Sequence, residues 1–325
     1  MTLTLRNLLI AILALFVYAC ASSDSSSNNP EGSATTKMQT AAAYALDGTP
    51  LYPPAETAAS RQRKDSLLAI AEADFQTDSH KLDNIIWYGR RLAYLSRYQE
   101  AIEVYTKGMQ DHPDSPELYR HRGHRYISIR KFDQAIADFE QAAQLAEGRP
   151  VEIEPDGIPN KINIPLSTLQ FNIYYHLALT HYLKGEFEKA VTIYEKCMEY
   201  STNPDLLIAT TDWLYMSYQR MGQEEKATDL LQAISSEMEI IENTSYLTRL
   251  LLYKGEKEAK ELLDLTNTTP EDQLDIVTQG YGVANWHYYN GRKDQAIAIL
   301  EQLMKTDYWS AFGYIAAEAD LERMR

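Results

Sequence analysis

Residues 89–108 read GRRLAYLSRYQEAIEVYTKG, and residues 123–142 read GHRYISIRKFDQAIADFEQA. The two stretches align without a gap when one is moved 34 residues along the chain. Small residues pair with small ones and large apolar residues with large ones. These pairs are Gly89 with Gly123, Ala101 with Ala135, Gly108 with Ala142, Leu92 with Tyr126, Tyr98 with Phe132 and Tyr105 with Phe139. A 34-residue period of this kind indicates a stacked array of helix–turn–helix units.

These residues resemble the tetratricopeptide repeat family. The resemblance implies that small side chains mark the crossing of two antiparallel helices and that large ones fill the layer between them. Tyr98 and Phe132 would close the end of each hairpin. Pro113 separates the two units, because proline cannot continue a helix without losing a hydrogen bond.

The turn and second helix recur with looser spacing after Gly185, Gly222 and Gly291, and a shorter copy follows Gly255. We therefore expect an all-α solenoid of five to six repeats over residues 80–325, because a single unit cannot bury its own apolar face. The alternative is a non-repeating helical bundle whose matches arise by chance. It does not explain why several positions coincide at one offset. A helical pattern ahead of the array predicts an N-terminal capping helix within residues 55–79. Its apolar stripe is Leu67, Leu68, Ile70, Ala71 and Phe75.

The period is interrupted between the second and third repeats. Ala135 and Ala190 are 55 residues apart, which exceeds the period by 21, so we expect an insertion at about residues 146–170. Its prolines exclude a regular helix. Its alternating aliphatic residues predict that the segment is ordered and packed: Val151, Ile153, Ile158, Ile162 and Ile164. Such a segment either binds a ligand or serves as a structural flap.

The first residues predict export. Arg6 is followed by an unbroken apolar run over residues 8–17, which is too short for a transmembrane helix and typical of a secretory signal. Val17-Tyr18-Ala19-Cys20 resembles the bacterial lipobox, which implies a signal peptide over 1–19 and diacylglyceryl and fatty acyl (palmitate) chains at Cys20. The polar residues that follow predict a flexible tether, which we place within 20–54. An ordinary secretory signal that ends near a cysteine is the alternative.

Charge and sorting rules limit the partners. The formal net charge is −15, and −16 without Arg6, so we expect no nucleic-acid partner and membrane contact through the lipid alone. By analogy with lipoprotein sorting, Ala21 favours an outer membrane, facing the periplasm. Four stretches also resemble a group of exported bacterial tetratricopeptide repeat lipoproteins, from which no activity transfers. They are residues 120–142, 154–160, 171–187 and 312–321. The other cysteine, Cys197, takes a small-residue position and is expected to be a buried, inert thiol.

In the family, the first helix of each repeat lines a concave groove. Its inward positions are rich in arginine and tyrosine, the residue types that anchor interfaces. A guanidinium group can hold a carboxylate through two hydrogen bonds, so we expect a protein or peptide partner with an acidic or C-terminal carboxylate end. Alternatively, these arginines pair with acidic residues of 152–156 and only pin the insertion. The candidate contact residues are Arg90, Tyr94, Arg120, His124, Tyr175, Tyr182, Asp212 and Arg220.

The sequence therefore predicts a lipid-anchored, non-catalytic adaptor of the bacterial cell envelope that needs no cofactor. A metal-dependent hydrolase is the alternative, using histidines near the insertion, and an envelope spacer without a specific ligand is a third possibility. His121 and His124, three residues apart, can share a helix face, whereas His176 and His181 do not share one well. No HExxH, CxxC, GxSxG or phosphate-binding glycine motif occurs in the chain.

Overall fold

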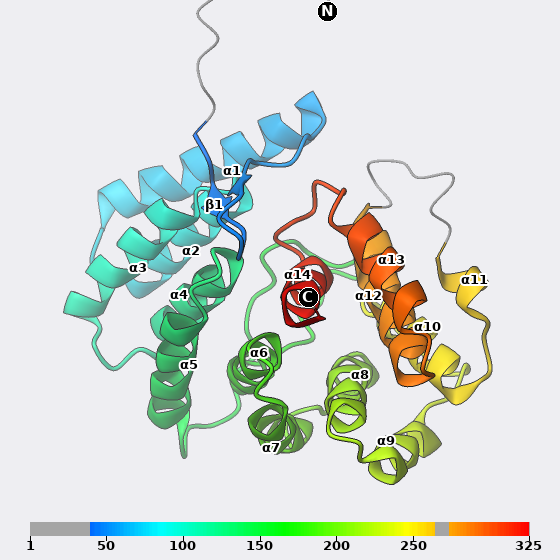
Figure 1. The fold of residues 1–325 in the computed structure, drawn as a ribbon. Helices are drawn as coiled ribbons and strands as arrows, with labels where there is room; N and C mark the ends of the chain where they lie inside the picture. The colour runs from blue at the N-terminus through cyan, green and yellow to red at the C-terminus, as the bar shows by residue number, and fades with distance from the viewer. Residues whose placement is uncertain (1–39, 264–272, 325) are drawn as a thin grey trace, which may run out of the picture. The chain divides into compact units, whose positions relative to one another are not determined.

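The computed structural model describes residues 40–263 and 273–324, and in these residues it contains fourteen α-helices (Figure 1). The all-α prediction is thereby confirmed, apart from a hairpin of two short strands and one 3₁₀ helix. The elements are β1 (Ala43–Tyr44), β2 (Pro50–Leu51), α1 (Ala58–Thr77), α2 (Leu82–Tyr94), α3 (Tyr98–Asp111), α4 (Pro116–Ser128), α5 (Phe132–Ala146), α6 (Leu169–Leu183), α7 (Phe187–Met198), α8 (Pro204–Arg220), α9 (Glu224–Leu230), η1 (Leu231–Ala233), α10 (Thr244–Lys254), α11 (Ala259–Leu262), α12 (Gln273–Tyr289), α13 (Lys293–Leu303) and α14 (Phe312–Met324).

Helices pair in sequence order, which confirms the solenoid. Within the described part of the chain the pairs are α2–α3, α4–α5, α6–α7, α8–α9, α10–α11 and α12–α13. The small residues lie where the helices cross: a Cβ added at Gly89 would lie 2.4 Å from the ring of Tyr105, and one added at Gly123 would lie 3.0 Å from the ring of Phe139. The 34-residue period therefore records a packing requirement that recurs in each unit.

The turn inside each repeat requires one residue with positive φ. In the later repeats this residue is glycine, with φ between 68° and 81° at Gly185, Gly222, Gly255 and Gly291. In the first two repeats Ser96 and Arg130 take the same conformation, with φ of 60° and 61°. A side chain is disfavoured there, so these two positions carry a backbone cost that glycine avoids.

The segment ahead of the array differs from the prediction. The tether was expected to extend through residue 54, but β1 and β2 form an antiparallel hairpin in which Ala43 pairs with Leu51 and both are buried. The Trp309 indole nitrogen donates to the Tyr52 carbonyl at 2.6 Å, which ties this segment to the C-terminal part. The rest of the predicted tether, the signal peptide and Cys20 lie outside the described residues.

Helix α1 forms within the predicted range and packs on α2, the first helix of the array. Leu68 and Ala71 are buried, as the apolar stripe predicts. Ile70, however, is 60% exposed and does not belong to the packed face. None of the helices in residues 40–263 and 273–324 is both long and apolar enough to cross a membrane.

The last helix fills the side of the array on which α6, α8 and α12 lie. Figure 1 shows α14 between α6 and α12. Ile315, Ala316, Ala317 and Leu321 of this helix are buried in one core cluster with residues of α6, α7 and α8. Such a helix covers the apolar layer that the terminal repeat would otherwise expose.

Residues 147–168, which connect α5 to α6, form a non-helical segment that we call the strap. Ile153 and Thr168 form an antiparallel bridge that joins its two ends, and Thr168 caps α6 through its side chain. The expectation that its aliphatic residues are packed is wrong. They are exposed: Val151 by 56%, Ile153 by 61%, Ile158 by 69%, Ile162 by 44% and Ile164 by 57%. Polar contacts, described below, hold the strap instead.

Candidate partner-binding face

Three arginines of the first two repeats hold the strap. Arg120 forms an ion pair with Glu154 at 3.0 Å, and both side chains are only 10% exposed. Arg90 donates to the Pro155 carbonyl at 2.8 Å, and Arg91 donates to the Gly157 carbonyl at 3.0 Å. The predicted alternative, in which groove arginines pin the acidic segment, is therefore the arrangement that the structure adopts for Arg120 and Glu154.

A cluster of histidines lies at the seam between the second and third repeats. His124 of α4 and His176 of α6 face each other with ring centroids 4.6 Å apart, and Phe312 at the start of α14 packs on both at 5.4 and 5.5 Å. His121 accepts a hydrogen bond from Arg120 at 3.0 Å. The Nδ1 atom of His124 is enclosed, and no described residue offers it a hydrogen bond.

Burial favours the neutral form of these imidazoles. Burial and the positive charge of Arg120 lower the pKa of His121 well below its ordinary value, and burial and Arg125 do the same for the pKa of His124. Burial, followed by Arg120, lowers the pKa of His176 to about 3. Near neutral pH the cluster therefore packs as uncharged aromatic rings.

Four other predicted contact residues are buried in polar contacts with α10, α12 or α14. The Tyr281 hydroxyl donates to Asp320 at 2.9 Å and lies 2.8 Å from the hydroxyl of Tyr182. Arg220 forms an ion pair with Asp320 and donates to Asn285 at 2.6 Å. The Tyr175 hydroxyl donates to the Tyr246 hydroxyl of α10 at 3.3 Å.

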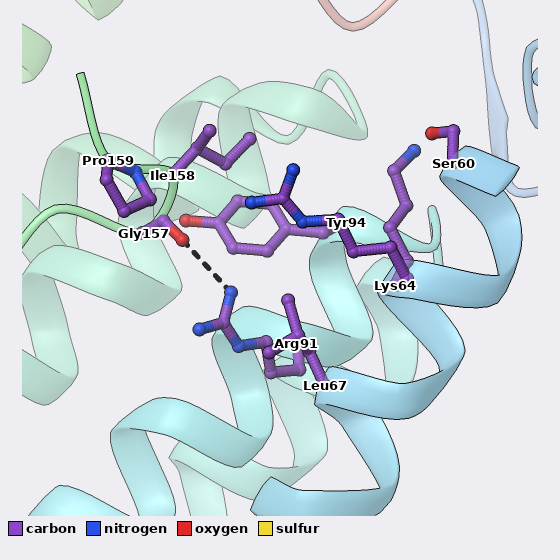
Figure 2. Close-up of a pocket in the computed structure, with 9 residues that line it drawn as sticks. Ser60, Lys64, Leu67, Arg91, Tyr94, Gly157, Ile158 and Pro159 are labelled. Atoms are coloured by element: carbon purple, nitrogen blue, oxygen red, sulfur yellow. Dashed lines mark hydrogen bonds between the residues drawn. The ribbon is translucent and has the colours of Figure 1, made fainter. Parts of the chain in front are cut away.

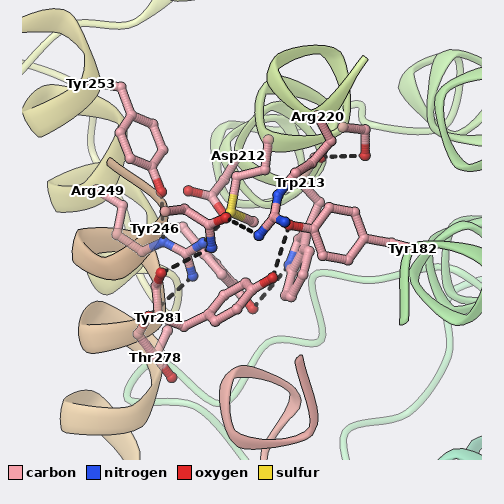
Figure 3. Close-up of polar contacts among 12 residues, drawn as sticks. Tyr182, Asp212, Trp213, Arg220, Tyr246, Arg249, Tyr253, Thr278 and Tyr281 are labelled. Carbon is pink, nitrogen blue, oxygen red and sulfur yellow. Dashed lines mark hydrogen bonds and ion pairs between the residues drawn. The ribbon is translucent and has the colours of Figure 1, made fainter. Parts of the chain in front are cut away.

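Asp212 belongs to a second buried network (Figure 3). Its carboxylate lies 2.8 Å from the Arg249 guanidinium, and both side chains are fully buried. Arg249 also donates to the Thr278 carbonyl at 3.1 Å. Burial raises the pKa of Asp212 to about 7, and the charge of Arg249 only partly opposes this shift.

The eight predicted residues thus divide into two groups. Arg120, Tyr175, Tyr182, Asp212 and Arg220 are inside the protein, in contact with the strap, α10, α12 or α14; the expectation that they line an open groove is wrong. The groove positions were inferred from each repeat by itself, whereas these contacts come from elements distant in the sequence. Arg90, Tyr94 and His124 remain partly exposed.

Helix α1, helix α2 and the strap enclose a pocket of about 310 Å³, which we call the basic pocket (Figure 2). Each of the three supplies one wall. The lining residues are Ser60, Arg63, Lys64 and Leu67 of α1, Arg91 and Tyr94 of α2, and Gly157, Ile158 and Pro159 of the strap. Of these only Tyr94 was predicted from the sequence as a partner contact; α1 and the strap lie outside the repeats. The basic run Arg61 to Lys64 was the available signal.

The described residues do not support the hypothesis of a metal-dependent hydrolase. In residues 40–263 and 273–324, no three His, Cys, Asp or Glu side chains come together in a way that could hold a metal ion. Arg120 donates a hydrogen bond to His121, and the Nδ1 atom of His181 lies 2.8 Å from the Glu186 carboxylate. Cys197 is buried, as predicted, and burial raises the pKa of its thiol to about 12, so the reactive thiolate is scarce near neutral pH.

Comparison with known proteins locates a repeat of known type. The family model described as "Tetratricopeptide repeat" matches residues 171–204, which contain most of α6 and all of α7. "BBSome complex member BBS4" of Bos taurus is 27% identical over 149 residues, 46% of this chain and 24% of that protein. "RNA polymerase II-associated protein 3" of Mus musculus is 35% identical over 85 residues, 25% of this chain and 13% of that protein. The chain thus spans about a quarter or less of the length of these relatives.

Solved structures of repeat proteins align with large parts of the chain at low similarity. YrrB, described as "a TPR protein with an unusual peptide-binding site", aligns over 77% of this chain and 97% of its own, with 12% identity and a TM-score of 0.39. MamA aligns over 61% of this chain and 94% of its own, with 16% identity and a TM-score of 0.42.

Proposed function

We propose that this chain, a tetratricopeptide repeat protein, is a non-catalytic adaptor that holds a protein or peptide partner. The observation that carries the proposal is the stack of helical hairpins with close crossings at Gly89 and Gly123. Stacked repeats of this kind create an extended surface with side chains from several units. An adaptor needs such a surface and no reacting group.

A partner is more easily accommodated on the open surface beside the strap than in a site beneath α14. Displacing α14 would expose Ile315 and Leu321, each at a cost of roughly 1.5–3 kcal/mol, and would separate buried ion pairs as well. A partner would have to offset these costs before gaining affinity. We therefore place the binding surface on the open face that contains Arg90, Tyr94 and the basic pocket.

The chemistry of this face favours an acidic partner. The chain carries a net charge of −15, yet Arg63, Arg90 and Arg91 lie on or beside the pocket. Guanidinium groups hold carboxylates through paired hydrogen bonds. The preferred ligand is accordingly the acidic or carboxylate-bearing end of a protein or peptide.

Site-directed crosslinking in cells tests the adaptor function. A photoreactive residue in place of Ser60, in the basic pocket, should capture one defined protein, which mass spectrometry identifies and which in turn co-purifies this chain. The same residue in place of Lys226, exposed on α9, serves as the control. If no position on the face of α1, α2 and the strap yields a reproducible adduct, the chain is a spacer and the adaptor function is wrong.

The proposal includes a lipid anchor at Cys20, in a bacterial outer membrane and facing the periplasm. It rests on the apolar run over residues 8–17 and on the residues before Cys20. Each buried methylene of an acyl chain contributes about 0.8 kcal/mol to membrane binding, so several chains give stable attachment. Cys20→Ala should move the protein from the membrane pellet to the soluble fraction, and Cys197→Ala should leave it in the pellet. Continued pelleting of Cys20→Ala would contradict the anchor.

A further inference from the structure

We propose that the basic pocket binds an acidic peptide segment in which an aliphatic residue adjoins the carboxylates. The proposal rests on the adaptor function above and names its ligand class and its site. Two walls of the pocket, α1 and the strap, do not belong to the helix pairs of the array.

The cations of the pocket are short of counter-charges. Arg63 is exposed, and no described carboxylate forms an ion pair with it. Arg91 has only the neutral Gly157 carbonyl, at 3.0 Å, as a hydrogen-bond acceptor among the described residues. Lys64 forms an ion pair with Glu56 at 2.6 Å. Because only Lys64 of these three cations has a carboxylate partner in the described part of the chain, and no carboxylate there lines the pocket, the site is net positive in an acidic chain.

Like charges are close together at this site. Burial lowers the pKa of Arg91 below its ordinary value; Tyr94 opposes this shift, and the neighbouring charges of Arg90 and Arg63 add to it. Trp87 lies beneath both Arg90 and Arg91, with the guanidinium carbons 4.5 and 4.8 Å from the ring. A bound carboxylate would relieve this repulsion, and the packing against Trp87 keeps the guanidinium planes in place to receive it.

The remaining lining is apolar. Figure 2 shows Leu67, Tyr94, Ile158 and Pro159 around the pocket together with Arg91 and Lys64. Ile158 is 69% exposed, which is unfavourable for an isoleucine in water. An aliphatic side chain of the ligand that covered Ile158 and Leu67 would bury this surface while the neighbouring carboxylates met Arg63 and Arg91.

Close packing of the strap fixes the dimensions of the pocket. A Cβ at residue 157 would lie 1.5 Å from the Tyr94 hydroxyl and 2.6 Å from an Arg90 nitrogen. Gly157 therefore lets the strap approach α2 closely enough for Arg91 to reach its carbonyl. In Gly157→Ala the Tyr94 ring has to turn away, which changes the pocket without removing a charge.

The test uses the full-length chain in detergent and a library of random heptapeptides immobilised through their N-termini. We expect enrichment of peptides with at least two acidic residues next to Leu, Ile or Val. For an enriched peptide, Arg63→Ala and Arg91→Ala should each raise the dissociation constant at least tenfold, and Lys226→Ala should leave it unchanged. Enrichment of another class of peptide, or undiminished binding by Arg63→Ala, would overturn the proposal.

Arg63 is the most informative position because it is exposed, so its loss should leave the fold unchanged. Unchanged helical circular dichroism and unfolding midpoint will confirm that point. The peptide-library test of the pocket can also fail independently of the crosslinking test of the adaptor function. Crosslinking that captures a partner while the library shows no acidic preference would reject this site only, whereas a chain that captures no partner at all would reject the adaptor function.

Discussion

Arg130 occupies a backbone position at which the later repeats carry glycine. Its φ of 61° costs roughly 1–2 kcal/mol for a residue with a side chain. The guanidinium offsets this cost through three contacts: an ion pair with Glu318 at 2.8 Å and hydrogen bonds to the carbonyls of Ser128 and Trp309. The strained residue therefore also ties the second repeat to α14.

Ser96 at the equivalent turn provides a matched comparison for Arg130. Arg130→Gly relieves the backbone but leaves the buried Glu318 without its ion-pair partner, so we expect a loss of about 2–4 kcal/mol in unfolding free energy. Ser96→Gly relieves the same conformation with little loss of contact and should be neutral or stabilising by up to about 1 kcal/mol. Urea unfolding measures both variants. A similar effect of the two substitutions would mean that the Arg130 side chain does not hold α14.

At the scale of elements, the sequence predicts what is local and misses what is distant. The period identified the hairpins because each crossing, such as that of Gly89 with Tyr105, lies within one unit. It placed Arg220 in a groove but could not show that Asp320, 100 residues away, covers it. No local pattern carries such a contact, because α14 belongs to no repeat. The strap was found from the interruption of the period, whereas its exposed isoleucines contradict the rule that alternating aliphatic residues are packed.

The strap should open locally when its ion pair is removed. Arg120→Ala leaves Glu154 without its ion-pair partner in a site where both side chains are 10% exposed. The hydrogen bonds that Arg90 and Arg91 donate to the strap remain, so we expect more frequent local opening of the strap and not global unfolding. Thermolysin should then cleave within residues 147–168 at least tenfold faster, which corresponds to about 1.4 kcal/mol of local opening free energy.

Lys161→Ala is the control for this experiment, because Lys161 lies in the same segment and is exposed. Its cleavage rate should match that of the unmodified chain. Equal protection of the strap in Arg120→Ala would show that the carbonyl contacts of Arg90 and Arg91 suffice to hold it.

At the scale of the molecule, buried ionisable groups give stability a pH dependence in two opposing directions. The pKa values of His121, His124 and His176 are lowered in the folded state, so below about pH 6.5 the unfolded chain binds protons that the folded chain does not. Each such histidine reduces stability by about 1.4 kcal/mol per pH unit as the pH falls toward its folded pKa. Stability from these groups is therefore complete above pH 6.5 and is lost in acid.

Asp212 acts in the opposite direction. Its pKa is raised to about 7 in the folded state, so between about pH 7 and 4 the folded chain binds a proton that the unfolded chain does not. Stability from this group is present in acid and is lost as the pH rises through 7. Three histidines outweigh one carboxyl, so we expect the unfolding free energy to fall overall between pH 6.5 and 4.5.

The slope of stability against pH, measured by urea unfolding at several pH values, separates these contributions. His124→Asn should reduce the loss below pH 6.5 by about 1.4 kcal/mol per pH unit, since one imidazole no longer takes up a proton on unfolding. Asp212→Asn should make the loss steeper by a similar amount, because it removes the opposing carboxyl, although Arg249 then lacks its partner and the variant is less stable at every pH. The two slopes must change in opposite directions; a change of the same sign would mean that Asp212 is ionised in the folded protein over this range.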